Sequence, residues 1–466
     1  MASRIPRPDV LAEWLAGQRW FASKTRRIAG VETVDELPLA GAVIAILDVT
    51  LDDGTVQRYA APLRAGSPVA DALDDPEFCR ALLALMAGGG HAAGGHGELR
   101  GEAVVASLLE VPPDVSVRRL PGEQSNTSVV FGRSLILKHF RKLAAGTNPE
   151  VEIGRFLTER VPFPNTPRLA GHLEYRGADG TTTAIAVVQE LVHGGRDGWE
   201  WMLEQLAMFY GQARSAGRPP APEYVADLAP SSLAALRRLG EQTAALHRAL
   251  ATDTRDPAFA PAPITATDVE TWTAGIRSQL EAARAVLGND RTLAEVPDAA
   301  AGLGSLLGRH KIRHHGDFHL GQTLYRPGAG EFVIIDFEGE PIRPLEERRR
   351  KHAAVRDVAG LLHSLDYAAV AARRDGDDEL AAWGDAWTAE AERAYLAGYR
   401  ATAGDASFLP VTEGGFLAAL AAFELEKAAY EVVYEANHRP HWIDIPRRGL
   451  LRAAARLRRS ASAAAG

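Results

Sequence analysis

The chain has 466 residues, of which 46% are hydrophobic and 24% charged, and its net charge is −8. This length exceeds one ordinary hydrophobic core, so two or three packed units are expected. The negative charge and the lack of a long basic block argue against nucleic acid as a partner, because phosphate backbones need a concentrated positive face. Cys79 is the only cysteine, which excludes an internal disulfide and a cysteine-rich zinc site. The start of the sequence has no signal-peptide core and no window reaches the roughly 20 apolar residues of a membrane helix, so we expect a cytoplasmic protein without a membrane partner.

The first part of the chain predicts a small α+β unit. Leu11, Trp14 and Leu15 have helical spacing, and the early aromatic residues fit a core better than a cofactor site. In "AVIAILDVTLDDGTVQRYAAPL" two β-rich runs flank Asp53-Gly54, a strong hairpin signal. The Gly- and Ala-rich stretch "AGGGHAAGGHGELRG" predicts a mobile connection. A second β-rich region follows over about 115–192, and after about residue 198 the chain is mainly helical, interrupted by strands around 312–336.

A segment between two β-rich runs consists of small polar residues, Ser125, Asn126, Thr127 and Ser128. A hairpin turn of this composition can present backbone N–H groups and hydroxyls to an anion. Lys138 follows one strand later in "SLILKHF", and Glu150 and Glu152 begin the next predicted helix. A strand lysine paired with a glutamate from the following helix is how kinases hold nucleotide phosphates. Such short patterns are common by chance, so alone they favour a hairpin with a solvated lysine.

The stretch "HHGDFHLGQTLYRPGAGEFVIIDFEGEP" crowds polar groups between runs that predict buried strands. Asp317, in a tight turn, suits the role of a base near an acceptor hydroxyl. Gln322 offers a neutral oxygen, and Asp336 offers an anionic one at the end of a predicted strand. Hard oxygen ligands of mixed charge are typical of a magnesium site. The order base, amide ligand, strand, carboxylate ligand is the order found in kinases.

Two other interpretations of this stretch stay open. In the first, its histidines belong to the core and Asp317 merely forms a turn, which leaves Asp336 and Glu338 unexplained after an apolar strand. In the second, a transition metal for hydrolysis is bound by His314, His315, His319 and Asp317. Adjacent histidines in a strand point to opposite faces, which argues against that metal site.

Several motifs together closely resemble the bacterial maltokinases, which belong to the aminoglycoside phosphotransferase and choline kinase branch of the kinase-like fold. The matching stretches are "QRWFASKTR", "EQSNTSVVFG", "LKHFRKLAAGTNPEVEIGRFL", "HHGDFHLGQTL", "VIIDFEGEP", "PLEERRRKHAAVRDVAGLLHSLDYAA" and "AFELEKAAYEVVYEANHRPHWIDIP". They cover most of the chain in the family's order. The resemblance implies an α+β, bilobal, eukaryotic-protein-kinase-like fold with an extra N-terminal α+β cap subdomain. The implied parts are a cap over 1–88, a β-rich nucleotide-binding lobe over 89–197 and a mainly helical lobe over 198–466.

The resemblance also implies roles for residues at matching positions. Asp317 would be the catalytic base near the anomeric hydroxyl of a sugar, and His319 would lie at the substrate. Magnesium would be held by Gln322, which stands where broader phosphotransferases have Asn, by Asp336 and by Glu338, which replaces the glycine of the D-F-G triplet of protein kinases.

For ATP, the resemblance implies a phosphate loop over 125–128 and a phosphate-gripping pair of Lys138 and Glu152. Glu150 is the less suitable partner, because the family match has Glu at the second of the two positions. The hinge, "VVQELV", would offer backbone groups to adenine from Gln189, Glu190, Leu191 and Val192.

The acceptor sugar is expected on one helix, "AFELEKAAYEVVYE", where Phe423, Lys427, Tyr430 and Tyr434 share a face. Glu431 lies beside that face. Aromatic rings near carboxylate and ammonium groups fit a sugar, whereas a plain core stripe is weakened by the lysine within it. Because the resemblance puts this helix beside the acceptor, we favour a sugar site formed by Lys427, Tyr430, Glu431 and Tyr434.

Three other polar or aromatic residues have less specific interpretations. Arg439 and Trp442 either complete the wall of this site or pack the C-terminus. Asp357, at the start of the helix "VRDVAGLLHSL", is expected to steady the catalytic loop rather than to touch substrate.

The resemblance implies an ATP:maltose 1-phosphotransferase that produces maltose 1-phosphate for glycogen, α-glucan and trehalose metabolism, in association with enzymes of those routes. A kinase for glucosamine or another small sugar is the alternative within the same fold. A catalytically silent nucleotide-binding module is the alternative from another class, against which the set Lys138, Asp317 and Asp336 argues.

Overall fold

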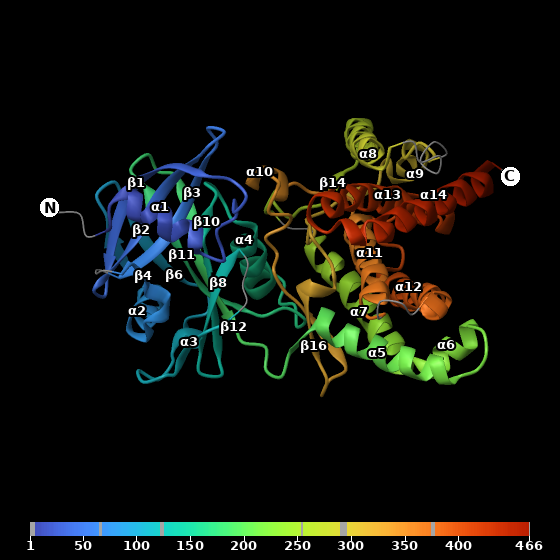
Figure 1. The fold of residues 1–466 in the computed structure, drawn as a ribbon, viewed down its shortest axis with the longest axis horizontal. Coiled ribbons are helices and arrows are strands. Elements are labelled where there is room, and N and C mark those ends of the chain that lie inside the picture. The colour runs from blue at the N-terminus through green and yellow to red at the C-terminus, as the bar shows by residue number, and fades with distance from the viewer. Residues whose placement is uncertain are drawn as a thin grey trace. The chain divides into compact units, whose positions relative to one another are not determined.

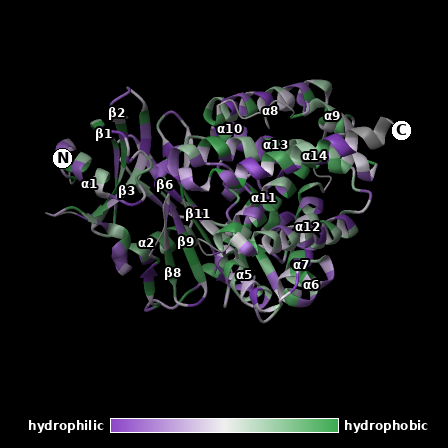
Figure 2. Cartoon of the chain, turned by 45° about the vertical axis from the view of Figure 1, so that its right-hand side comes forward, coloured by the Kyte–Doolittle hydropathy of each residue, from purple (hydrophilic) through white to green (hydrophobic). Residues whose placement is uncertain are grey.

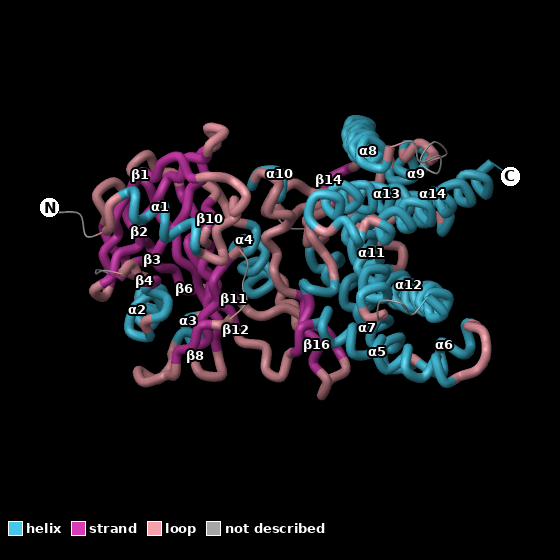
Figure 3. The backbone as a smooth tube through the Cα atoms, viewed as in Figure 1, coloured by secondary structure: helices cyan, strands magenta, loops and turns pink. Residues whose placement is uncertain are grey.

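The computed structural model describes residues 5–64, 68–121, 125–252, 255–288, 296–373 and 378–465. The chain forms two compact units: unit 1 is Met1–His193 with Ile342–Arg348, and unit 2 is Gly194–Pro341 with Arg349–Gly466. Figure 1 gives the course of the chain, and Figure 3 shows that strands dominate unit 1 and helices dominate unit 2. The expected change to helical structure after residue 198 is confirmed, since α5 begins at Gly198.

The N-terminal part of unit 1 is built on an antiparallel sheet. Its strands are β1 (Ile28–Leu39), β2 (Ala42–Leu51), β3 (Val56–Arg64), β4 (Ala70–Asp71) and β10 (Lys142–Leu143). Strands β2 and β3 are joined by the expected hairpin, in which Gly54 has a φ of 82° that a side chain would strain. Strand β10 comes from much later in the chain and pairs with β3, so this sheet is completed by a segment that lies, along the chain, between strands of the second sheet.

Both faces of this sheet are buried, which explains the nearly continuous apolar run of β2. One face packs on α1 (Pro8–Gly17) and on Trp20 and Phe21, each 2% exposed, so the expected core role of the early aromatic residues is confirmed. The other face shares a hydrophobic core with α2 (Pro76–Ala87) and with the second sheet of unit 1.

The second sheet has the strand order β5-β6-β11-β12-β9-β8-β7. Its strands are β5 (His91–Ala93), β6 (Gly97–Ala103), β7 (Val117–Arg119), β8 (Asn126–Phe131), β9 (Leu135–Phe140), β11 (Leu169–Gly177) and β12 (Thr182–Glu190), and its short helical segments are η1 (Ala72–Asp74), α3 (Ala106–Leu109), α4 (Pro149–Arg155) and η2 (Phe156–Arg160).

The Gly-rich stretch that predicted a mobile connection instead forms β5 and β6, so that prediction is wrong. Some of its glycines serve close packing. A Cβ at Gly101 would lie 2.2 Å from the backbone oxygen of Leu85 in α2, and one at Gly94 would lie 2.6 Å from the carboxylate of Asp35 in β1. Gly94 and Gly101 therefore allow the close approach of neighbouring elements, whereas Gly89, with a φ of 57° and nothing near its Cβ position, serves the turn after α2.

Unit 2 is mainly helical, and its described residues also form one three-stranded and one two-stranded sheet. The helices include α5 (Gly198–Ser215), α6 (Pro222–Leu228), α7 (Pro230–Leu250), α8 (Ala266–Leu287), α9 (Ala300–Leu303), α11 (Val355–Ala371), α12 (Ala381–Ala403), α13 (Glu413–His438) and α14 (Asp444–Ala465), and the strands include β13 (Arg196–Asp197), β14 (Ala262–Pro263), β15 (His310–Lys311), β16 (Thr323–Arg326) and β17 (Glu331–Ile334). Figure 2 shows hydrophobic and hydrophilic residues interleaved along these helices. Helices α7 and α12 meet at glycines: a Cβ at Gly240 would lie 2.0 Å from the Tyr395 oxygen.

Candidate active site

The backbone of the loop that carries Asp317 is hydrogen-bonded to one buried carboxylate. Asp357, in the first turn of α11, is 2% exposed and accepts hydrogen bonds from the backbone N–H groups of His315 (2.8 Å) and Gly316 (3.0 Å). Burial alone would raise the pKa of Asp357, but the neighbouring histidines outweigh it and lower the pKa, so the carboxylate stays ionised. The expectation that Asp357 steadies this loop is confirmed.

Behind Asp357 the support continues into α7 and α12. Nε2 of His247 lies 3.0 Å from a carboxylate oxygen of Asp357, and Nδ1 lies 2.9 Å from the hydroxyl of Tyr399. His247 and Tyr399 were not singled out in the sequence. They stand 110 and 42 residues from Asp357, so only the packed helices reveal the chain of contacts.

The same loop is tied to the strand end that delivers Asp336. Nε2 of His315 lies 2.9 Å from the carbonyl oxygen of Ile335, which can only accept, so this nitrogen carries the proton. The Ile335 N–H in turn donates to the carbonyl of Gln322 at 3.0 Å. The backbone of Gln322, just before β16 begins, is therefore tied to the residue before Asp336, just after β17 ends, and a shared magnesium site stays a prediction.

His319 lies close to Asp317. Its Nε2 is 4.0 Å from Oδ2 of Asp317. Burial lowers the pKa of His319, and the charge of Asp317, with a smaller influence from Asp336, opposes that effect. Within unit 2, the Asp317 carboxylate thus faces a half-buried imidazole.

Asp336 has a backbone conformation that is rare for a residue with a side chain. Its φ is 66°, and Ala40 is the other non-glycine residue with positive φ in the described ranges. This left-handed conformation costs free energy and persists where the surroundings demand it, commonly at functional sites. The conformation follows directly on the buried strand β17 and turns the chain toward Glu338.

The expected acceptor face of α13 is only partly exposed to solvent. Lys427 Nζ lies 3.3 Å from Oε1 of Glu431 and 3.8 Å from Oδ1 of Asp317, so this face of α13 meets the loop that carries Asp317. Burial alone would lower the pKa of Lys427, but the two carboxylates outweigh it and raise the pKa. Burial raises the pKa of Glu431, against the opposing influence of Lys427.

Two tyrosines continue this face of α13. The Lys427 ammonium lies 5.4 Å from the Tyr430 ring centroid, and the rings of Tyr430 and Tyr434 are nearly parallel at 6.3 Å. Tyr434 is 38% exposed and stacks on His438 at 4.3 Å. One face of Tyr434 is therefore occupied by the protein itself.

Phe423 of α13, and Arg439 and Trp442 just beyond it, pack against other side chains of the protein. Phe423 is 1% exposed and contacts the His352 ring at 5.3 Å, so it belongs to the core. Arg439 pairs with buried Glu435 at 2.6 Å and lies 4.7 Å from the Trp442 ring. Of the two interpretations of Arg439 and Trp442, these contacts favour packing of the C-terminus.

An arginine links the acceptor helix to the segment after Asp336. Arg356 of α11 lies 3.1 Å from a carboxylate oxygen of Glu426, the neighbour of Lys427, and 3.3 Å from one of Glu340. Burial would lower the pKa of Arg356, but these two carboxylates raise it instead. Glu340 and Glu426 were missed in the sequence because each is one acid among several in its stretch, and only the fold shows that they share a partner.

The histidines of the loop do not converge on one point. His314 lies against the His352 ring at 5.6 Å, His315 points to Ile335, and Nδ1 of His319 accepts from the Gly321 N–H at 3.1 Å. In the described part of the chain, no group of three or more His, Cys, Asp or Glu side chains could hold a metal ion. The transition-metal interpretation of this stretch therefore finds no support.

In unit 1, the strand register separates the predicted nucleotide residues into two faces. Ser128 pairs directly with Lys138, so their side chains share a face, and Lys138 lies half-buried with its ammonium 5.7 Å from the Phe140 ring. Thr127 pairs with His139 on the opposite face, and its hydroxyl accepts from Arg141. The predicted loop is thus shorter than expected, because strand β8 already begins at Asn126 and only Ser125 precedes it.

The other predicted nucleotide residues lie near one another in the same sheet region. Glu150 is 1% exposed and accepts from the side-chain amide of Gln189 at 2.9 Å, which turns that predicted hinge side chain inward. Glu152 is half-buried in α4, and its pairing with Lys138 stays a prediction. The N–H groups of Glu190 and Leu191 donate to the carbonyls of Arg168 and Ser134, at 3.0 and 2.8 Å.

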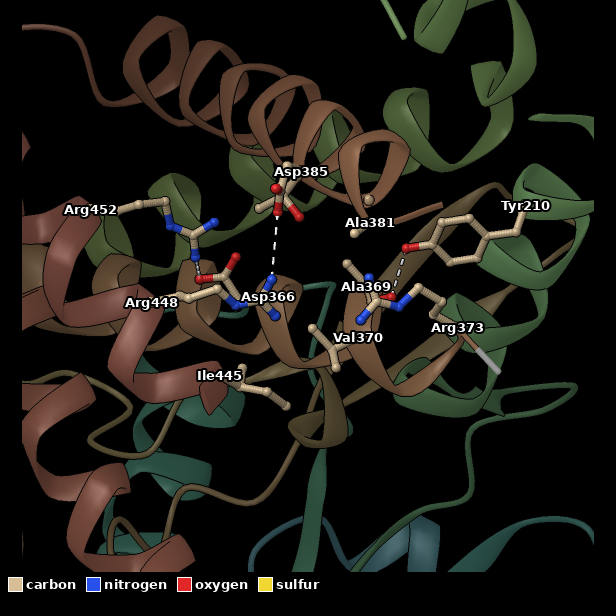
Figure 4. Close-up of a pocket in the computed structure, with 12 residues that line it drawn as sticks. Tyr210, Asp366, Ala369, Val370, Arg373, Ala381, Asp385, Ile445, Arg448 and Arg452 are labelled. Carbon is tan, nitrogen blue, oxygen red and sulfur yellow. Dashed lines mark hydrogen bonds and ion pairs between the residues drawn. The ribbon is translucent and has the colours of Figure 1, made fainter. Parts of the chain in front are cut away.

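A separate cavity in unit 2 lies between α5, α11, α12 and α14 (Figure 4). Its volume is about 20 Å³, which suits about one water molecule. Two of the three arginines that line it face carboxylates of the protein, since Arg452 pairs with Asp366 and Arg448 lies 3.9 Å from Asp385. This cavity is too small for a nucleotide or a sugar.

In the described ranges, no helix is long and apolar enough to span a bilayer.

Comparison with known proteins identifies relatives of this chain. Residues 14–92 match the maltokinase N-terminal cap domain family. A glucosamine kinase of Streptacidiphilus jiangxiensis is 30% identical over 353 residues, which are 74% of this chain and 74% of that protein. A glucosamine kinase of Mycolicibacterium smegmatis is 29% identical over 336 residues, 71% of this chain and 77% of that protein.

Solved structures of glucosamine kinase have the same fold. Crystal form B has a TM-score of 0.66 and 26% identity, and covers 93% of this chain and 97% of its own. A structure in complex with glucosamine, ADP and inorganic phosphate has a TM-score of 0.66 and 24% identity, with 95% and 98% covered.

The fold and the relatives together define a small-sugar kinase with an added N-terminal cap. The expected fold class is confirmed. Within that class, the chain belongs to the family of these glucosamine kinases, and its own residues 14–92 match the maltokinase type of cap.

Proposed function

We propose that this protein transfers the γ-phosphoryl group of ATP to the anomeric hydroxyl of maltose, giving maltose 1-phosphate and ADP. The observation that carries the proposal is the contact of Lys427 with Asp317, because it joins the aromatic face of α13 to the predicted base. The maltokinase-type cap over residues 14–92 supports maltose as the acceptor.

In the proposed reaction Asp317 accepts the hydrogen bond of the sugar hydroxyl and takes its proton as the new P–O bond forms. The bond between the γ-phosphorus and the bridging oxygen breaks, and ADP leaves with that electron pair. The two N–H donors that hold the loop on Asp357 fix the position of Asp317, and such positioning is the main protein contribution to phosphoryl transfer.

For the nucleotide, unit 1 offers Lys138 and Ser128 on one sheet face for the phosphates, with Ser125 and Asn126 just before them. Glu152 is proposed as the partner of Lys138. Because the N–H groups of Glu190 and Leu191 are engaged inside the lobe, we assign the adenine-facing donor to Val192 and the acceptor to the Glu190 carbonyl.

Magnesium fits the residues at the ends of β16 and β17. The backbone bond from Ile335 to Gln322 puts Gln322 next to the residue before Asp336, and Glu338 follows two residues on. An amide oxygen and two carboxylates are the hard-oxygen donor set that this ion prefers. The left-handed backbone of Asp336 supports a functional demand at this point. A bound magnesium ion would neutralise the phosphate charge; these three residues would hold it.

The charge of the acceptor site favours a neutral sugar over an amino sugar. Lys427 is a protonated, largely buried cation beside Asp317 and Glu431, so it partly cancels the two carboxylates that an ammonium group would seek. The hydroxyls of maltose can bind these charges, with the second ring against Tyr430 and Tyr434. His319 is proposed as a further contact to the reacting hydroxyl.

Glucosamine is the second candidate acceptor, supported by the 30% and 29% identical relatives. The test offers ATP and Mg²⁺ with maltose, glucosamine, glucose or kanamycin separately, and locates the phosphate by NMR. Maltose 1-phosphate is the expected product. Glucosamine phosphate as the main product would overturn the acceptor, and bound ADP without turnover on any sugar would indicate a silent nucleotide-binding module.

A further inference from the structure

The cap and the nucleotide-binding sheet are joined by a buried arginine. Arg141 is fully buried and lies between β9 of the second sheet and β10 of the first, so one continuous stretch of chain crosses from sheet to sheet. Its backbone carbonyl accepts from the Ala60 N–H in β3 at 2.9 Å. The guanidinium lies 4.6 Å from the Trp20 ring of the cap. A charge in this position requires strong compensation.

The compensating charge is supplied by Asp71 of the cap. Asp71 is 6% exposed, and its Oδ2 accepts from Nη2 of Arg141. On its other side the guanidinium donates from Nε to the hydroxyl of Thr127 at 2.8 Å. Through Arg141, Asp71 is thereby linked to Thr127 at the start of strand β8. The next residue, Ser128, lies on the proposed nucleotide face.

Asp71 reaches the preceding strand as well. The same Oδ2 lies 3.3 Å from Nη1 of Arg119, the last residue of β7, and Asp74 lies 3.0 Å from that nitrogen. Strands β7 and β8 are paired, with the Leu120 N–H donating to the Ser128 carbonyl at 2.9 Å. One carboxylate of the cap therefore holds both strands of the hairpin, at the end where they approach the nucleotide face.

We propose that Asp71 is a positioning residue through which the cap sets the geometry of the β7–β8 hairpin, and with it the affinity for the phosphates of the nucleotide. The inference rests on the proposed nucleotide site at Ser128 and Lys138. Asp71 does not touch the nucleotide. It acts through Arg141 and Arg119, which fix Thr127 and the end of β7 relative to each other.

A second buried cap carboxylate provides a matched control. Asp35 is 3% exposed, its Oδ1 accepts from the Gly95 N–H at 2.6 Å, and its Oδ2 accepts from the Tyr175 hydroxyl at 3.0 Å. It ties the cap to the same sheet, but at the β5–β6–β11 side rather than at β7–β8. Its loss should weaken the docking of the cap without moving the hairpin.

The experiment compares Asp71→Asn, Arg119→Gln and Asp35→Asn in the full chain. Each is measured for KM of ATP, KM of the sugar, ADP affinity by calorimetry and melting temperature. Asp71→Asn should raise KM of ATP and the ADP dissociation constant about fivefold or more, with KM of the sugar nearly unchanged. Arg119→Gln, at a partly exposed position, should shift both in the same direction by less. Asp35→Asn should lower the melting temperature but leave both nucleotide constants unchanged.

Unaltered nucleotide constants in folded Asp71→Asn and Arg119→Gln would overturn the inference, as would an equal rise in Asp35→Asn. Should Asp71→Asn fail to fold, Arg119→Gln decides. Lys138→Met tests the proposed nucleotide site separately from the positioning role of Asp71. If Lys138→Met weakens ADP binding while Asp71→Asn and Arg119→Gln do not, only the positioning role is wrong. If Lys138→Met has no effect, the proposed nucleotide site is itself wrong.

Discussion

The ammonium of Lys427 lies 3.8 Å from the Asp317 carboxylate, so helix α13 and the loop that carries Asp317 meet through an ion pair. If Asp317 is the base, Asp317→Asn should reduce turnover by a factor of about 100 to 10,000 because an amide cannot accept the proton. ADP affinity should remain close to wild type. Turnover within a few-fold of wild type would show that the proton goes elsewhere.

The charge of Lys427 should govern the choice of acceptor. Lys427→Met should raise KM of maltose about tenfold or more through the loss of a charged hydrogen bond. It should also shift the ratio of kcat/KM for glucosamine over maltose upward, because the repelling cation is gone. Combining it with Glu431→Gln removes the carboxylate left unpaired, and this double variant should lose the gain for glucosamine. An unchanged ratio in both variants would exclude the electrostatic argument.

Arg356 should support both the acceptor helix and the segment after Asp336. Arg356→Gln leaves the carboxylates of Glu340 and Glu426 without their shared cation, so the free energy of unfolding should fall by about 3 kcal/mol. We expect kcat and KM of the acceptor to worsen together. Arg393→Gln is the control, since its side chain is 62% exposed and its pair with Glu390 should contribute less than about 1 kcal/mol. Equal effects of the two substitutions would contradict the linking role.

The left-handed backbone of Asp336 predicts that stability and activity separate at this residue. Asp336→Gly should abolish turnover, yet the free energy of unfolding should stay the same or rise by about 1 kcal/mol because glycine relieves the strain. Ala40→Gly, at the other non-glycine residue with positive φ in the described part of the chain, should gain stability with normal turnover. A large loss of stability in Asp336→Gly would mean that the carboxylate mainly holds the fold.

Buried neutral histidines should make the protein sensitive to acid. Burial lowers the pKa of His363 to about 3, so between pH 6.5 and 3 the unfolded chain binds a proton that the folded chain does not. Folding stability from this group is full above pH 6.5 and is lost as the pH falls below that value, by about 2 kcal/mol at pH 5. His363→Gln should reduce the loss between pH 7.5 and 5 by that amount in denaturant titrations, whereas exposed His441→Gln should not. Parallel curves for wild type and His363→Gln would refute the assignment.

Local signals in the sequence predicted part of the fold. Turn chemistry predicted the Asp53-Gly54 hairpin, helical spacing put Lys427, Tyr430 and Tyr434 on one face of α13, and the expected support of the loop by Asp357 is confirmed. The expected place of that face beside the acceptor came from the resemblance to maltokinases, because periodicity within one segment does not report which distant loop the segment meets.

The errors arose where contacts between distant segments decide the structure. The glycines over 87–101 were interpreted as a sign of a mobile connection, although Gly101 lets helix α2 pack closely against the sheet. Thr127 was grouped with its polar neighbours, although the register turns its hydroxyl to Arg141. Asp71 and Arg141 are 70 residues apart, and neither has a local pattern that marks it. Side-chain pairing over such separations is fixed by the fold alone.

Strand β10 also bears on how this protein can be rearranged by engineering or descent. The matched cap segment, residues 14–92, lacks the strand from 142–143 that pairs with β3, and its removal would take away the Asp71 carboxylate that pairs with buried Arg141. The segment is therefore not an autonomous cassette. Grafting it onto an uncapped kinase, or deleting it from this one, would leave unmatched surface on both products, so the two parts are bound to change in concert.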